Sequence, residues 1–113
     1  MQNHIMGYHE YQVKWRPSYN EELEARREPE NMKDAFAVCV LRNEEIVGHL
    51  KKGDNGRFAR TIFYFLRADA GNRCRAIVKG MPVNDGDGMG MKVPCELVFY
   101  GQRRFINILR EQL

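Results

Sequence analysis

Three polar residues near the middle of the chain, His49, Lys51 and Lys52, have the chemistry to bind a phosphate group. An imidazole beside two ammonium groups offers several hydrogen-bond donors together with positive charge, and both favour an anionic ligand. Gly48 precedes them and would let another backbone or a ligand approach closely, because it has no side chain. The same histidine could instead be an ordinary strand-end residue whose ring makes one hydrogen bond inside the protein. These residues alone do not decide between the two interpretations.

Other residue combinations were weighed as metal sites. Three histidines and three cysteines could hold zinc, but no Cys-x-x-Cys or His-x-x-x-His pair has the close spacing of structural zinc sites. The run from Asn84 to Gly88 resembles the start of a calcium loop, and Glu96 stands at its twelfth position counted from Asp85. The flanking segments, however, have the pattern of strands rather than helices. We therefore predict a flexible hairpin loop there, no metal site and no cofactor.

Motifs of the common enzyme classes are missing from the chain. It contains no Gly-x-Ser-x-Gly, no phosphate-binding loop and no His-Glu-x-x-His. A nuclease site could be imagined from Glu10, Asp34 and His49, yet metal-dependent nucleases need clustered carboxylates. Most acidic residues here fall on the solvent faces of predicted strands. We therefore predict that the domain is not an enzyme.

Length and composition favour a single globular domain. The chain has 113 residues, of which 43% are hydrophobic, enough for one compact core. No apolar run approaches the roughly 20 residues of a membrane helix, and the N-terminus lacks the pattern of a secretory signal. Cys39, Cys74 and Cys95 are odd in number and widely spaced. We expect them to be buried free thiols in an intracellular protein.

Positive charge is concentrated in one part of the chain. The formal net charge is only +3, but residues 51–79 contain eight basic and two acidic residues, whereas residues 1–50 contain six basic and nine acidic. Such a cluster attracts phosphates and accelerates association with them. On charge alone, an ordinary solvated face of a helix and a strand explains the cluster equally well.

Alternation of apolar and polar residues predicts that most of the chain forms strands. We expect strands over 8–15, 22–26, 36–41, 46–50, 73–78 and 93–99. The strand over 36–41 is apolar on both faces, so it should be covered on both. Phe58, Ile62, Phe65 and Leu66 recur at helical spacing and predict a helix after Gly56. A short amphipathic helix should end the chain.

This order of elements predicts a mainly β, α+β fold. The best match is a small, partly open β-barrel of about six strands, OB-like or SH3-like, with two packed helices. Residues 1–7 are expected to form a flexible lead-in, and residues 8–113 a single domain.

Two linked motifs resemble the HIRAN domain family. Residues 27–38 (REPENMKDAFAV) fit that family's pattern R-E-P-x-N-x-x-D-x-x-A-[VI]. A short hairpin later, residues 47–50 (VGHL) fit V-G-[HY]-[LI], and residues 93–101 more loosely resemble the family's final strand. The resemblance spans residues 8–113 and implies an OB-like barrel. It identifies the chain as a divergent member, either standing alone or as one domain of a larger protein.

The best understood members of this family bind single-stranded DNA ends and capture the free 3′-hydroxyl. Carried over by position, the resemblance implies that Asp34 accepts the hydrogen bond of the terminal hydroxyl, since carboxylates accept such bonds strongly. Asn31 would brace the connection or contact the sugar. His49 and Lys52 would face phosphates, with Lys51 as a further candidate.

Three positions depart from the family's pattern for base stacking. Lys33, before the motif aspartate, and Met91, before the final strand, stand where end-binding members have aromatic residues. Glu10 aligns with part of a basic–aromatic pair and would repel a phosphate. Because stacking is worth about 1–3 kcal/mol per base, we expect DNA ends to bind more weakly here than in those members.

The sequence thus predicts a non-catalytic nucleic-acid-binding module for single-stranded DNA and its 3′-hydroxyl end. The predicted contacts are Asn31, Lys33, Asp34, His49, Lys51, Lys52 and Met91. The alternative is a protein-interaction module that keeps the barrel and has lost DNA-end binding, which the missing aromatic residues and the acidic first half favour. No membrane partner is expected. The resemblance also implies a nuclear location and a role in DNA repair.

Overall fold

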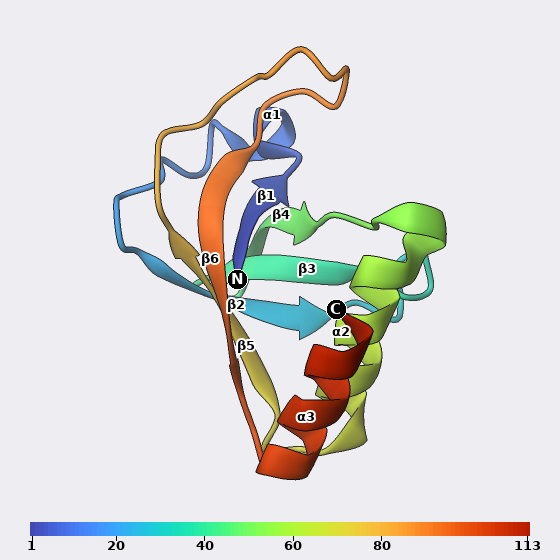
Figure 1. Cartoon of the computed structure of the whole chain (residues 1–113). Coiled ribbons are helices and arrows are strands. Elements are labelled where there is room, and N and C mark those ends of the chain that lie inside the picture. The colour runs from blue at the N-terminus through green and yellow to red at the C-terminus, as the bar shows by residue number, and fades with distance from the viewer.

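Six antiparallel strands close into a barrel in the computed structural model, which describes all 113 residues (Figure 1). The strands are β1 (Gln2–Met6), β2 (Glu22–Arg27), β3 (Val38–Arg42), β4 (Glu45–Leu50), β5 (Arg73–Val78) and β6 (Val93–Tyr100). Their order around the barrel is β1-β4-β3-β2-β5-β6. This confirms the predicted mainly β fold. The barrel is closed rather than partly open, because β1 pairs with both β4 and β6.

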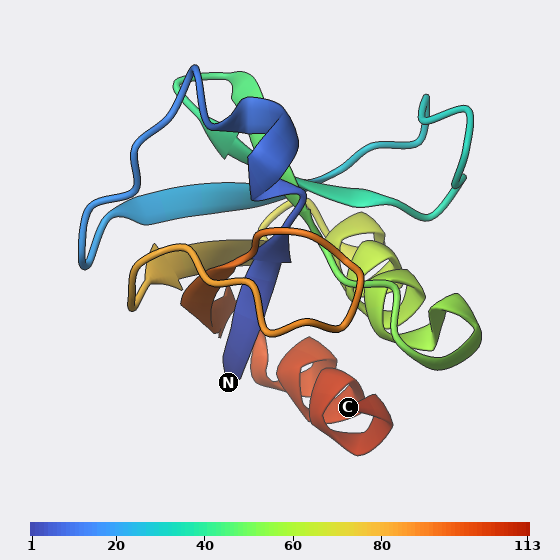
Figure 2. The same cartoon turned by 90° about the horizontal axis from the view of Figure 1, so that it is seen from above.

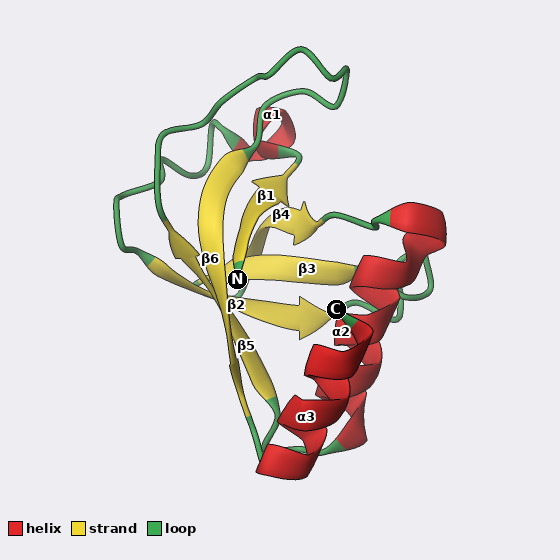
Figure 3. Ribbon diagram, in the orientation of Figure 1, coloured by secondary structure: helices red, strands yellow, loops and turns green.

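Two longer helices lie against one side of the barrel (Figure 3). Helix α2 (Arg57–Ala68) packs on β2 and β3, and α3 (Arg103–Gln112) packs on α2. Both were predicted from the sequence. The structure adds a single helical turn, α1 (Tyr8–Tyr11), and a 3-10 turn, η1 (Asp54–Gly56). None of these helices combines the length and apolar character needed to cross a membrane.

The core fills the barrel and continues beneath α2. Ile5, Val38, Val40 and Leu97 point inward from three strands and are at most 1% exposed. Ile62 adds the buried face of α2. All residues of β3 from Val38 to Leu41 are buried, which confirms the prediction that this strand is covered on both faces. Cys39, Cys74 and Cys95 are buried free thiols, as expected.

The N-terminal segment departs from the sequence prediction. Residues 1–7 were expected to be a flexible lead-in, but Gln2–Met6 form β1 and complete the barrel. Its residues alternate in burial, with Asn3 and Ile5 buried. The alternation was present in the sequence, but polar Asn3 on the inward phase concealed it.

Residues 8–15, predicted as a strand, form α1 and a turn. Tyr8 and Trp15 are buried with their rings 5.8 Å apart, and the Tyr8 hydroxyl donates to the Trp15 carbonyl oxygen at 3.1 Å. Val13, which a strand would have buried, is 96% exposed. The residues at positions 8, 11 and 15 follow a helical spacing, which competes with the alternating pattern of residues 9–15. Gly7 allows the change of direction after β1, because its φ of 82° lies in the left-handed region.

Candidate nucleic-acid interface

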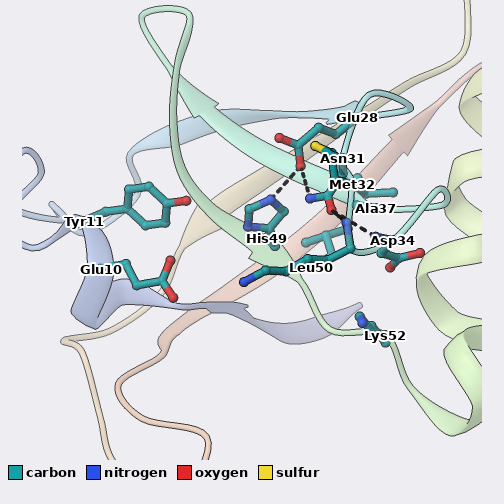
Figure 4. Close-up of a pocket in the computed structure, with 12 residues that line it drawn as sticks. Glu10, Tyr11, Glu28, Asn31, Met32, Asp34, Ala37, His49, Leu50 and Lys52 are labelled. Carbon is teal, nitrogen blue, oxygen red and sulfur yellow. Dashed lines mark hydrogen bonds and ion pairs between the residues drawn. The ribbon is translucent and has the colours of Figure 1, made fainter.

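A cleft of about 500 Å³ opens on the outside of the barrel, between α1, the end of β4 and the connection from β2 to β3 (Figure 4). It brings together five of the seven predicted contact residues: Asn31, Lys33, Asp34, His49 and Lys52. The lining is completed by Glu10, Tyr11, Glu28, Met32, Ala37, Val38 and Leu50. The residues come from segments that are far apart in the sequence, so the cleft is a product of barrel closure.

Asn31 organises the turn that carries the acidic residue of the cleft. Its Oδ1 accepts hydrogen bonds from the backbone N–H groups of Lys33 and Asp34, at 2.9 and 3.0 Å. Its Nδ2 donates to Glu28 Oε1 at 2.9 Å. An asparagine that bonds to the backbone two and three residues ahead stabilises a turn. Of the two roles considered for Asn31, the structure shows the bracing one.

Asp34 is half-buried and keeps one carboxylate oxygen free. Its Oδ1 accepts the backbone N–H of Phe36 at 2.9 Å, which fixes the direction of the side chain. Its Oδ2 has no hydrogen-bond partner within the chain. A carboxylate held in this way can accept one hydrogen bond from a hydroxyl without rearranging.

His49 lies on β4 and is held by an acid on the opposite wall of the cleft. Its Nε2 is 2.7 Å from Glu28 Oε1. The other ring nitrogen, Nδ1, makes no hydrogen bond within the chain. Gly48 is required beside it, since a Cβ atom there would lie 2.4 Å from Ile5 Cγ2 and 2.8 Å from the Met6 carbonyl oxygen. The close approach predicted at this glycine is therefore that of the β1 backbone.

Charges in the cleft are mixed. Lys33 and Lys52 are exposed cations, and neither takes part in an ion pair within the chain. Glu10 and Asp34 place negative charge in the same cleft. A polyanionic ligand would therefore meet repulsion as well as attraction in this cleft.

Tyr11 is a lining residue that sequence reasoning missed. The predicted strand over 8–15 gave its ring no relation to Asp34, but α1 places it in the cleft beside Glu10 (Figure 4). Burial first, and then the nearby carboxylates Glu10 and Glu28, raise the pKa of the Tyr11 hydroxyl, which keeps it protonated. Tyr11 thus offers an aromatic ring and a hydrogen-bond donor. Glu28 was also missed as a site residue, although it stands in the quoted motif.

Three solved structures of one domain resemble this chain over its whole length. The crystal structure of the HIRAN domain of human HLTF matches with a TM-score of 0.72 at 23% identity, covering 100% of this chain and 84% of that one. An NMR structure of the HLTF HIRAN domain matches with a TM-score of 0.68 at 21% identity, covering 100% and 85%. This chain has the fold of a HIRAN domain. The motifs in residues 27–50 therefore indicated the correct fold.

A third HIRAN structure in the comparison is the NMR structure of the HLTF HIRAN domain in its DNA-bound conformation. It matches with a TM-score of 0.66 at 22% identity, covering 100% of this chain and 84% of that one. No family model and no curated protein sequence matches the chain. The similarity is thus carried by the HIRAN fold, while most residues differ.

Two predicted contact residues lie outside the cleft of this HIRAN fold. Lys51 lines a different pocket, with its Nζ 5.2 Å from the centre of the Phe58 ring. Met91 packs against the core, and its carbonyl oxygen accepts the backbone N–H of Tyr8 at 3.1 Å. Lys51 was predicted as an ammonium group beside His49, and Met91 from its position before the family's final strand. Neither residue lines the cleft, because Lys51 lies over Phe58 and Met91 packs against the core.

Carboxylates that suggested a calcium loop are paired with a lysine instead. Lys92 Nζ lies 2.7 Å from Asp85 Oδ2 and 2.7 Å from Asp87 Oδ2. The Lys92 side chain is largely buried, with 9% of it exposed. No group of three or more His, Cys, Asp or Glu side chains is placed to hold a metal ion.

Proposed function

We propose that this domain is a non-catalytic module that binds single-stranded DNA at its 3′-hydroxyl end. The observation that carries the proposal is the meeting of Asp34, His49 and Lys52 in one cleft. A sugar–phosphate terminus needs an acceptor for its hydroxyl, which Asp34 Oδ2 supplies, and a cation for its phosphate, which Lys52 supplies beside the imidazole of His49. The DNA-bound conformation of the HLTF HIRAN domain supports nucleic acid as the class of ligand.

The carboxylates of the cleft give the proposed preference for a hydroxyl its physical basis. Asp34 Oδ2 is free to accept a hydrogen bond. A terminal phosphate in the same place would meet the negative charges of Asp34 and Glu10 instead, and juxtaposed like charges oppose binding. We therefore expect an unmodified 3′ end to bind better than a phosphorylated one.

Tyr11 takes the role of a stacking platform in this proposal. It lines the cleft that contains Asp34, and an aromatic ring can stack on any base at about 1–3 kcal/mol. One ring gives less stacking energy than several, so binding is expected to be modest. The proposal includes the nuclear location and the role in DNA repair that the family resemblance implies.

The test is fluorescence anisotropy at low salt with oligonucleotides of one sequence ending in a 3′-hydroxyl or a 3′-phosphate. A hydrogen bond to a charged group is worth about 1.5–3 kcal/mol, which corresponds to a preference of roughly 10- to 150-fold for the hydroxyl. Asp34→Ala should remove the preference. Because this variant also loses the hydrogen bond between the Phe36 N–H and the Asp34 carboxylate, we expect its free energy of unfolding to fall by about 1.5–3 kcal/mol.

Three results would count against the proposal. Equal affinity of the native domain for both ends would exclude capture of the hydroxyl. An absence of binding to either oligonucleotide would leave the protein-interaction module as the better explanation. Cleavage of labelled DNA in the presence of magnesium or manganese would show that the module is catalytic.

A further inference from the structure

Outside the cleft, aromatic rings and arginines form one continuous surface on α2. This aromatic–arginine surface consists of Arg27 at the end of β2, Phe36 in the connection to β3, and Tyr64 and Arg67 on α2, with the buried ring of Phe63 beneath them. The ring centres of Phe36 and Tyr64 are 5.5 Å apart, and those of Phe36 and Phe63 are also 5.5 Å apart. Tyr64 is 41% exposed although it belongs to this cluster.

Both arginines of the surface stack on its rings. Arg27 Cζ lies 5.4 Å from the ring centre of Phe63, and Arg67 Cζ lies 4.6 Å from that of Tyr64. Guanidinium planes and aromatic rings are the groups on which proteins stack the unpaired bases of single strands. The surface thus offers stacking groups and positive charge within a few ångströms of each other.

These arginines lack acidic partners, unlike others on the barrel. Arg26 pairs with Glu24 and Glu44, and Arg42 pairs with Glu21. No ion pair involves Arg27 or the arginines of α2, which are Arg57, Arg60 and Arg67. Helix α2 contains no acidic residue at all. Its charge is therefore available to an anionic partner.

The surface adjoins the cleft through one turn of the chain. Asp34 faces the cleft, and the backbone N–H of Phe36, two residues later, bonds to Asp34 Oδ1. The Phe36 ring packs on α2. Seen from above, the connection between β2 and β3 extends outward on the side of the barrel that carries α2 (Figure 2). A strand that ends at Asp34 can leave the cleft over Phe36 and Tyr64.

We propose that the aromatic–arginine surface binds the nucleotides upstream of the 3′ end held in the cleft. Bases stack on Tyr64 and on the guanidinium of Arg67, and backbone phosphates lie near Arg27 and Arg67. This inference rests on the proposed function, because it uses the cleft as the anchor of the strand. It adds a second contact region, whose contribution grows with the length of the strand.

The experiment compares 3′-hydroxyl oligonucleotides of about 4 and about 12 nucleotides, both within the range of about 4–16 nucleotides bound by OB-type folds. We expect Arg67→Glu and Tyr64→Ala each to weaken binding of the longer oligonucleotide by roughly 5- to 150-fold, the loss of one stacked base. Binding of the shorter one should change little. Asp34→Ala should weaken both. Thermal unfolding checks that Tyr64→Ala remains folded. Arg67 is exposed, so Arg67→Glu tests the surface without removing a packed side chain.

Tyr19 and Lys79 provide a matched control pair. Lys79 Nζ lies 5.4 Å from the ring centre of Tyr19, which is 70% exposed. Tyr19 precedes the first residue of β2, whereas Arg27 is the last residue of that strand, so the control pair lies at the opposite end of the barrel. Tyr19→Ala and Lys79→Glu should leave binding of both oligonucleotides unchanged.

Each contrary result has a distinct meaning. If Arg67→Glu and Tyr64→Ala leave the longer oligonucleotide unaffected while Asp34→Ala weakens the shorter one, the surface is not part of the interface and the cleft still is. If the shorter oligonucleotide does not bind the native domain, the proposed function itself fails. Equal losses in the control pair would show non-specific attraction.

Discussion

Glu28 and His49 join the two walls of the cleft through an Oε1–Nε2 contact of 2.7 Å. The same oxygen accepts the Nδ2 hydrogen of Asn31 at 2.9 Å. The Glu28 side chain is only 12% exposed. One glutamate therefore orients the imidazole on β4 and the asparagine that shapes the Asp34 turn. We infer that Glu28 is a positioning residue of the site.

Replacing Glu28 should lower the stability of the domain and weaken its binding to a 3′-hydroxyl oligonucleotide. In Glu28→Ala, two partners lose a nearly buried acceptor, so we expect the free energy of unfolding to fall by about 1–3 kcal/mol. Glu28→Gln keeps an amide oxygen for Asn31 and should cost less. Urea unfolding measures the first effect, and anisotropy with a 3′-hydroxyl oligonucleotide measures the second. Unchanged affinity in Glu28→Ala would mean that the cleft does not need this arrangement.

Lys52 and Lys51 should behave differently despite being neighbours. Lys52 lines the cleft, whereas Lys51 lies over Phe58 outside it. Lys52→Glu is expected to weaken binding of all single strands and to reduce the slope of log affinity against log salt by about 0.7, the value for one phosphate contact. Lys51→Glu carries the same change of charge and serves as the control. Equal effects would indicate long-range attraction rather than a contact.

Tyr11 should contribute through its ring rather than its hydroxyl. We expect Tyr11→Ala to weaken binding by about 1–3 kcal/mol, the value of one stacked base, and Tyr11→Phe to retain most of the affinity. Titration of both variants with the same 3′-hydroxyl oligonucleotide separates the two contributions. A larger loss in Tyr11→Phe than in Tyr11→Ala would contradict the stacking role.

Gly48 sets how closely β1 approaches β4. A methyl group there would lie 2.4 Å from Ile5 Cγ2 and 2.8 Å from the Met6 carbonyl oxygen. Because a well-packed core has little room to rearrange around an added methyl group, Gly48→Ala should destabilise the domain by about 1–3 kcal/mol. Urea unfolding tests this value, with Gly86→Ala as the comparison in an open loop, where no atom lies within 4 Å of the added carbon. Gly86 has a φ of 80°, which an alanine adopts only with strain, so Gly86→Ala measures the backbone cost alone.

Alkaline pH should destabilise the domain through its buried thiols. Burial raises the pKa of Cys74 to about 12, and that of Cys95 also to about 12. In the unfolded chain these thiols lose their protons near pH 8.5, while the folded state retains them. The free energy of unfolding should therefore fall as the pH rises above about 9. Unfolding experiments at several pH values should show a smaller fall in Cys74→Val, and an identical slope would refute this origin.

Local sequence patterns were sufficient for most of the fold. The hairpin of β3 and β4, helix α2, strands β5 and β6 and the final helix follow from residues close in the chain, because periodicity of burial is imposed on each element separately. The turn that carries Asp34 could also be predicted from the sequence, because Asn31 accepts hydrogen bonds from residues only two and three positions ahead. The motif that contains both residues indicated the HIRAN fold.

Closure of the barrel and the composition of the cleft depend on contacts between distant segments. Strand β1 is short and has polar Asn3 on its inward face, and it is held in place by pairing with β4 and β6. That pairing places α1, and with it Tyr11, beside His49 and Glu28. Lys51 and Lys52 are likewise separated by what they contact, since Lys51 lies over Phe58 while Lys52 lines the cleft. Periodicity describes one segment at a time, so it cannot show which segments meet.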